Sequence, residues 1–156
     1  NVWRISSEPY CLSAQDVRFF SDLGQHLLKF YSALNQLYLD SVKGKIPGWF
    51  AEYLDLGKPS DLIDYGRMNK FRQVLPGIIR PDVLVTAEGF AVSELDSVPG
   101  GFGLLSCLSS LYERKDQPLV GDAGGIPSLF YNMIENLADS PTLAIVVSDE
   151  ARDYLP

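Results

Sequence analysis

The chain has 156 residues, of which 46% are hydrophobic and 21% charged, a composition typical of a globular protein. We therefore exclude collagen-like, coiled-coil and disordered classes and expect a sizeable buried core. The 13 Lys and Arg residues against 20 Asp and Glu give a net charge of −7, which argues against binding to duplex nucleic acid or to an anionic membrane. The single histidine excludes zinc sites that need two or more histidines.

The two cysteines, Cys11 and Cys107, lie far apart and lack the spacing of a metal or redox motif. We expect two reduced thiols in a cytoplasmic protein. The longest apolar run, residues 143–147, is too short to span a membrane. The sequence begins without Met or a signal peptide and stops abruptly, so we also expect a fragment of a longer protein.

The first half of the chain shows a helical pattern. Ser13 is a good N-cap, and apolar side chains then recur every three or four residues over residues 14–42, which predicts a long helix with a bend or break near Gly24. Residues 49–54 are expected to form a short helix. Ser60 is expected to cap a further helix over residues 60–74, which Leu75-Pro76-Gly77 ends.

The pattern then changes to alternation over residues 79–86 and 90–96, which predicts two strands joined by a turn at residues 87–89. Helices are expected at residues 104–113 and from Pro127 to about residue 137. A short buried strand is expected at residues 142–147, and Ser148-Asp149-Glu150 are expected to cap a following helix. The fold class is therefore mixed α/β (α+β), with a helical segment at 1–75, a hairpin and helix at 76–118, and a further domain beginning at 119–156.

The hairpin gathers charged residues. Gly89 stands at the last turn position, where positive φ is needed. The turn length pairs Thr86 with Phe90, Asp82 with Glu94, and Arg80 with Asp96. Paired residues share one face of a sheet, so all four charged side chains are expected to form one cluster.

Like charges directly opposite each other destabilise a sheet, and apolar neighbours indicate that these strands are largely buried. A shared hard cation, Mg²⁺ or Mn²⁺, held by oxygens of Asp82, Glu94 and Asp96, would resolve the conflict. Arg80 beside it would suit a phosphate oxygen. The alternative is a salt-bridged surface hairpin in which Arg80 simply pairs with Asp96.

This hairpin resembles the metal-binding hairpin of ATP-grasp ligases. The residues that carry the resemblance are Arg80-Pro81-Asp82, Gly89 and Glu94-Leu95-Asp96-Ser97-Val98-Pro99-Gly100. The D-alanine–D-alanine ligase branch has the pattern R-x-D … G … E-x-N-x-x-P-G, and the glutathionylspermidine synthase-like branch has R-x-D … E-x-N with the same step as Asp82 to Glu94. The chain departs from both at Asp96, where Asn is usual.

The resemblance implies metal ligands at Asp82, Glu94 and Asp96, which would hold Mg²⁺ bridging the phosphates of ATP. It implies that Arg80 is catalytic and steadies the phosphoryl group in transfer. It also suggests substrate contacts at Ser97, Gly100 and Gly101. The order of parts is similar to the circularly permuted ATP-grasp branch, so residues 119–156 would begin a Rossmann-like half and the ATP-contacting lobe would follow Pro156.

We therefore expect a fragment of an ATP-dependent carboxylate–amine ligase that acts through an acylphosphate on small-molecule carboxylate and amine substrates. The fragment alone is expected to be inactive. The expected cofactors are ATP with Mg²⁺ or Mn²⁺. No nucleic-acid or membrane partner is expected, and the oligomeric state stays open. The alternatives are a non-catalytic α/β binding or scaffolding module and a degenerate ATP-grasp protein that has lost catalysis, to which Asp96 gives some weight.

Overall fold

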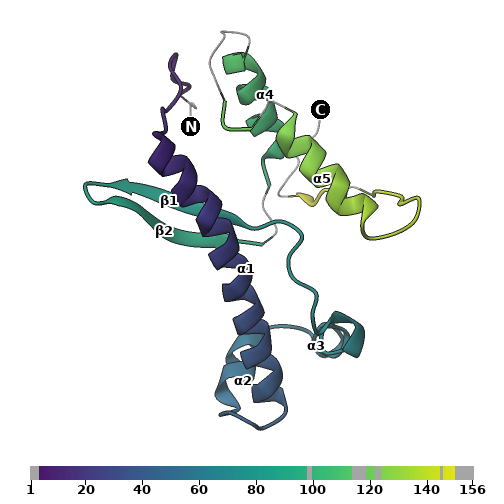
Figure 1. Ribbon diagram of the computed structural model, residues 1–156. Helices are drawn as coiled ribbons and strands as arrows, with labels where there is room; N and C mark the ends of the chain where they lie inside the picture. Colours follow the sequence, from purple (N-terminus) through teal and green to yellow (C-terminus); the bar gives the residue numbers. More distant parts are fainter. Residues whose placement is uncertain (1–3, 98–99, 114–118, 122–123, 145, 150–156) are drawn as a thin grey trace. The chain divides into compact units, whose positions relative to one another are not determined.

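The computed structural model describes residues 4–97, 100–113, 119–121, 124–144 and 146–149. The chain divides into two compact units, Asn1–Pro99 and Gly100–Pro156. The described residues form helices in both units and an antiparallel pair of strands in the first (Figure 1). The mixed α/β class is therefore confirmed. The three predicted domains stay predictions.

Helix α1 (Ala14–Val42) begins at a capping box. The Ser13 hydroxyl accepts from the Asp16 N–H at 3.2 Å, and the Asp16 carboxylate accepts from the Ser13 N–H at 2.7 Å. The helix runs through Gly24 without interruption, so the predicted break is wrong. One glycine costs a helix about 1 kcal/mol relative to alanine, which the surrounding helical turns outweigh.

Two shorter helices follow α1. Helix α2 (Trp49–Asp55) confirms the short helix predicted there. Helix α3 (Ser60–Gly66) begins near the expected position, but its N-cap is Pro59, so the predicted cap at Ser60 is wrong. The helix ends at Gly66, so the predicted extension to residue 74 is also wrong. The chain becomes extended at Met68 (φ −58°, ψ 142°) and makes only a 3₁₀ turn, η1 (Asn69–Phe71), afterwards. Glycine weakens helix propagation at this point.

A buried serine joins α1 to α2. The Ser41 hydroxyl donates to the Pro47 carbonyl at 2.8 Å and accepts from the Ala51 N–H at 3.1 Å. Among the described residues, the buried hydrophobic side chains are Leu27 and Ala51. The sizeable core expected from composition is therefore not present in the described part of the chain.

Strands β1 (Arg80–Thr86) and β2 (Gly89–Asp96) form the predicted antiparallel hairpin. Gly89 has the expected positive φ, 122°. The predicted pair of Thr86 with Phe90 is wrong, because Thr86 pairs with Gly89. A bulge at Ser93 then shifts the register by one residue and restores the predicted pairing further along the strands. The Ser93 hydroxyl donates to the Asp82 carbonyl at 3.1 Å.

The predicted charged pairs are confirmed, because the bulge shifts the register of the strands by one residue. No pattern in the sequence indicated this bulge. The register beyond it pairs Asp82 with Glu94 and Arg80 with Asp96. Because side chains alternate along each strand, the pairing also collects apolar residues on the opposite face of the hairpin. That apolar face consists of Pro81, Val83, Val85, Phe90, Val92 and Leu95.

Helix α1 crosses the hairpin (Figure 1). The Phe90 ring meets Phe19 and Phe20, with ring centroids 5.5 Å and 4.9 Å apart. Such aromatic contacts contribute about 0.5–1.5 kcal/mol beyond the area they bury. The long helix and the hairpin therefore belong to the same packed unit.

The second unit contains α4 (Phe102–Glu113) and α5 (Gly125–Glu135), which confirm the two helices predicted there. The Phe102 and Phe130 rings lie 6.1 Å apart and join them. The strand predicted at 142–147 is wrong for residues 142–144 and 146–147, which adopt no regular structure, while Ile145 lies outside the described residues. The expected helix cap falls partly on Glu150, which is also outside them. In the described part of the chain, no helix has the length and apolar character needed to cross a membrane.

Candidate functional site: the charged hairpin

The four charged residues singled out from the sequence share one face of the hairpin, as predicted. We call Arg80, Asp82, Glu94 and Asp96 the charged face. Arg80 holds two of the acids: its Nε lies 3.3 Å from Asp82 Oδ1, and its Nη2 lies 3.2 Å from Asp96 Oδ2. The guanidinium therefore bridges the two strands.

The predicted burial of these strands is wrong. Leu84 and Val85 are 57% and 62% exposed, and the Asp82 side chain is 51% exposed. Water screens such ion pairs, so each contributes about 0–1 kcal/mol to stability. The charged face is accessible to a ligand from solvent.

The three carboxylates do not converge in the way a metal site needs. Among the described residues, no group of three His, Cys, Asp or Glu side chains is arranged to hold a metal ion. Arg80 occupies the space between Asp82 and Asp96. As arranged here, the charged face does not fit a three-carboxylate ion site, although its oxygen donors suit Mg²⁺ chemically. The metal ligands stay predictions.

The residues suggested for substrate contact fall on both sides of the boundary between the units. Ser97 is exposed at the end of the first unit. Gly100 and Gly101 begin the second unit, where Gly101 has φ 82° and its carbonyl accepts from the Leu105 N–H at 3.1 Å. That geometry explains Gly101 as the start of α4, and substrate contact by all three residues stays a prediction.

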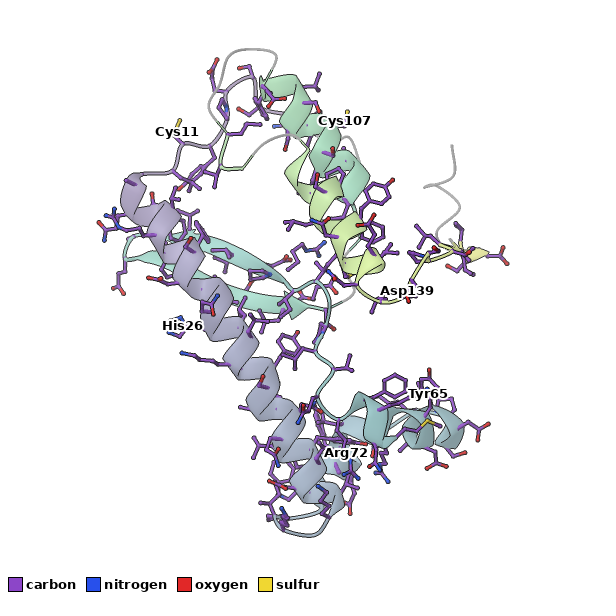
Figure 2. All side chains as sticks on the ribbon, turned by 45° about the vertical axis from the view of Figure 1, so that its right-hand side comes forward. Cys11, His26, Tyr65, Arg72, Cys107 and Asp139 are labelled. Carbon is purple, nitrogen blue, oxygen red and sulfur yellow. The ribbon has the colours of Figure 1, made fainter. Side chains whose placement is uncertain are left out.

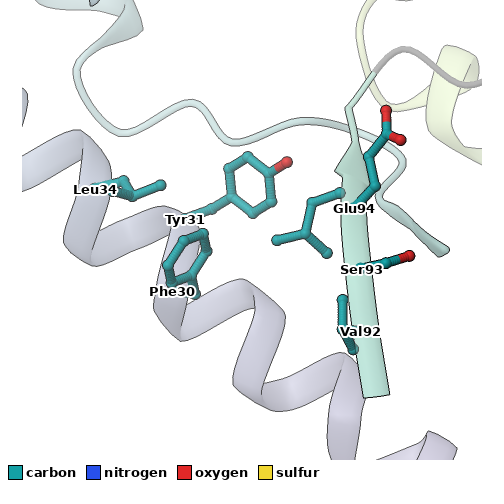
Figure 3. A pocket seen from close by; sticks show the side chains of 7 residues that line it. Phe30, Tyr31, Leu34, Val92, Ser93 and Glu94 are labelled. Carbon is teal, nitrogen blue, oxygen red and sulfur yellow. The ribbon is translucent and has the colours of Figure 1, made fainter. Parts of the chain in front are cut away.

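A groove of about 460 Å³ lies between α1 and β2 (Figure 3). Tyr31 extends from the helix toward the strand, and Glu94 belongs both to the groove lining and to the charged face. The full lining is Phe30, Tyr31, Leu34, Val92, Ser93, Glu94 and Leu95. The apolar pattern of residues 14–42 predicted a helix but gave no sign of this groove. A ligand with an apolar part and a positively charged end would fit this apolar lining and the Glu94 carboxylate.

Tyr38, Asp55 and Arg67 form a second polar cluster, which no pattern in the sequence predicted. The Tyr38 hydroxyl donates to Asp55 at 2.9 Å, Arg67 Nε donates to the Tyr38 oxygen at 3.0 Å, and Arg67 Nη2 lies 2.7 Å from Asp55 Oδ2. Burial raises the pKa of Tyr38 above its ordinary value, although the Arg67 hydrogen bond opposes the shift. The Tyr38 hydrogen bond raises the pKa of Arg67. The cluster joins α1, α2 and the end of α3, and its role is structural.

No family model, curated protein or solved structure matches the chain. The resemblance to ATP-grasp ligases therefore depends on the hairpin residues themselves.

Proposed function

We propose that the chain is part of an ATP-dependent carboxylate–amine ligase of the ATP-grasp type, which acts through an acylphosphate. In this proposal the charged face contacts the phosphate end of ATP. The observation that supports it is the pairing of Asp82 with Glu94 and of Arg80 with Asp96, which gathers the residues of the resembling motif on one accessible face. A cytoplasmic location belongs to the proposal and agrees with the unpaired cysteines Cys11 and Cys107.

Arg80 is the phosphate-binding group of this proposal. Its side chain is 39% exposed, and its guanidinium already pairs with a carboxylate on two sides, so phosphate oxygens could replace one of these carboxylates. A planar guanidinium binds such oxygens through two parallel N–H donors. The same contact would steady a phosphoryl group as it moves from ATP to the carboxylate substrate.

The charge of the face sets a condition on this chemistry. One arginine stands among three carboxylates, so the face repels the anionic phosphates of ATP when it is alone. The carboxylates as arranged here do not form an ion site, so the missing positive charge would have to arrive with the Mg²⁺ or Mn²⁺ that the phosphates of ATP carry. The proposal therefore expects ATP binding to depend strictly on a divalent cation.

The test is ATP consumption by the protein that contains this chain, with Asp82→Asn and Glu94→Gln variants. Each substitution removes a charge and keeps the shape, and each is expected to lower turnover by about a hundredfold or more, because charge compensation at the phosphoryl group dominates this chemistry. Glu88→Gln is the matched control, since Glu88 lies in the turn outside the charged face and should leave turnover unchanged. Wild-type turnover in both Asp82→Asn and Glu94→Gln would refute the assignment.

A second candidate is a non-catalytic binding module, and one observation favours it. Arg80 pairs with both Asp82 and Asp96, as in a hairpin whose charges satisfy each other. This candidate expects no heat when ATP and Mg²⁺ are titrated into the protein and no change in its melting temperature. The ligase proposal expects both effects.

A further inference from the structure

An open polar cavity of about 330 Å³ lies on the surface of the first unit, and none of its lining residues belongs to the charged face. It is bounded by α1 and by the segment that follows η1. Its lining residues are Ser32, Asn35, Gln36, Arg72, Gln73 and Leu75. Arg72 lies beside the C-terminal half of α1 (Figure 2).

The cavity is held together by hydrogen bonds of its own. The Asn35 side-chain amide donates to the Arg72 carbonyl at 2.6 Å and fixes the backbone of that residue on α1. The Arg72 N–H donates to the Asn69 carbonyl at 3.3 Å and closes the 3₁₀ turn. The backbone of Arg72 is therefore fixed at the cavity, on one side by Asn35 of α1 and on the other by Asn69.

The lining has one positive charge and four neutral hydrogen-bonding side chains. No acid of the described residues forms an ion pair with Arg72, although the chain carries an excess of acids. The Gln36 side-chain N–H donates to Asp40 at 2.8 Å, which fixes that amide and leaves its oxygen as an acceptor. The cavity thus offers a guanidinium together with amide and hydroxyl groups.

We propose that this cavity binds a small molecule with one carboxylate and a second, neutral polar group. The planar guanidinium of Arg72 matches the two oxygens of a carboxylate, and the glutamine and serine side chains match the neutral group. One arginine balances a monoanion, whereas a phosphate dianion would need further positive charge. The site uses no residue of the charged face and goes beyond the proposed function.

The test is an NMR titration of the ¹⁵N-labelled chain with succinamate, which carries one carboxylate and one amide. Saturable shifts are expected at the backbone amides around residues 32–36 and 72–73. Succinamide, the neutral diamide of the same size, should bind about tenfold more weakly or worse, because it loses the charge-assisted hydrogen bonds to Arg72. Inorganic phosphate should also bind more weakly than succinamate.

Two substitutions sharpen the result. Arg72→Gln is expected to weaken succinamate binding to the level of succinamide, and Arg18→Gln, at an exposed arginine elsewhere on α1, should leave it unchanged. Circular dichroism checks that both variants fold. Equal binding of succinamate, succinamide and phosphate, no saturable shift at residues 32–36 and 72–73, or unchanged affinity in folded Arg72→Gln would each overturn the proposal. If Arg72→Gln does not fold, the comparison of succinamate with succinamide in the wild type decides.

Discussion

Three polar side chains join the helices of the first unit. The cluster of Tyr38, Asp55 and Arg67 links three helices, and the Asp55 side chain is only 13% exposed. A buried carboxylate needs such partners, because an unpaired charge costs several kcal/mol. Tyr38 supplies a donor to Asp55 and an acceptor to Arg67 at the same time.

Tyr38→Phe is expected to lower the free energy of unfolding by about 0.5–1.5 kcal/mol for each lost hydrogen bond. It should also change the response to alkali. The folded pKa of Tyr38 lies above its unfolded value of 10.0, so wild-type stability from this group is complete below that pH and declines as pH rises through the folded pKa. Urea denaturation at several alkaline pH values should show a shallower decline in the variant. An identical decline would contradict the role given to Tyr38.

Arg80 is the only counter-charge that the charged face contributes to its three acids. Arg80→Gln should therefore lower hairpin stability by about 1 kcal/mol at low salt and by less at high salt, where charges are screened. Adding Asp96→Asn to that variant should recover part of the loss, since it removes one repelling charge. Thermal melts at two salt concentrations measure both effects. A salt-independent loss would show that packing of the Arg80 stem matters instead.

Local sequence patterns predicted some helices and strands of this chain better than others. The long amphipathic period and the N-cap at Ser13 were enough to predict α1, and alternation was enough to predict β1 and β2. Gly66 is a local signal for the end of α3, which the prediction of a helix over residues 60–74 passed over. No local pattern marks the bulge at Ser93, which puts Phe90 on the face opposite to Glu94, where its ring meets Phe19 and Phe20 of α1.

Gly24→Ala tests the continuity of α1. No atom beyond the local helix lies within 4 Å of the added methyl group, so alanine should stabilise the helix by about 0.5–1 kcal/mol. Thermal or urea denaturation measures the gain. A loss of stability would mean that α1 does bend at this residue.

Gly89→Ala makes the same substitution as Gly24→Ala but is expected to have the opposite effect on stability. The site is equally open, but φ is 122°, a conformation that an L-residue rarely adopts. Alanine should therefore destabilise the hairpin by about 1 kcal/mol or more. A neutral outcome would mean that the turn adopts another conformation.

At the scale of the whole molecule, sequence predicted the composition of the candidate site better than its geometry. The predicted pairs of Asp82 with Glu94 and of Arg80 with Asp96 are correct, but only because the bulge at Ser93 offsets the wrong pair at the turn. The spacing could not show that Arg80 lies between two of the acids, that the strands are exposed, or that a groove adjoins Glu94. Those properties depend on side-chain conformations and on α1, which is far away in the sequence.

The most direct test is to add Mn²⁺ with ATP to the ¹⁵N-labelled protein that contains this chain and to record which amide signals broaden. We expect selective broadening at Asp82, Glu94 and Asp96 that needs both ATP and the ion and that Asp82→Asn weakens. Broadening spread over surface acids such as Asp61 and Glu88, or none at the charged face, would contradict the claim that this hairpin binds the phosphates of ATP.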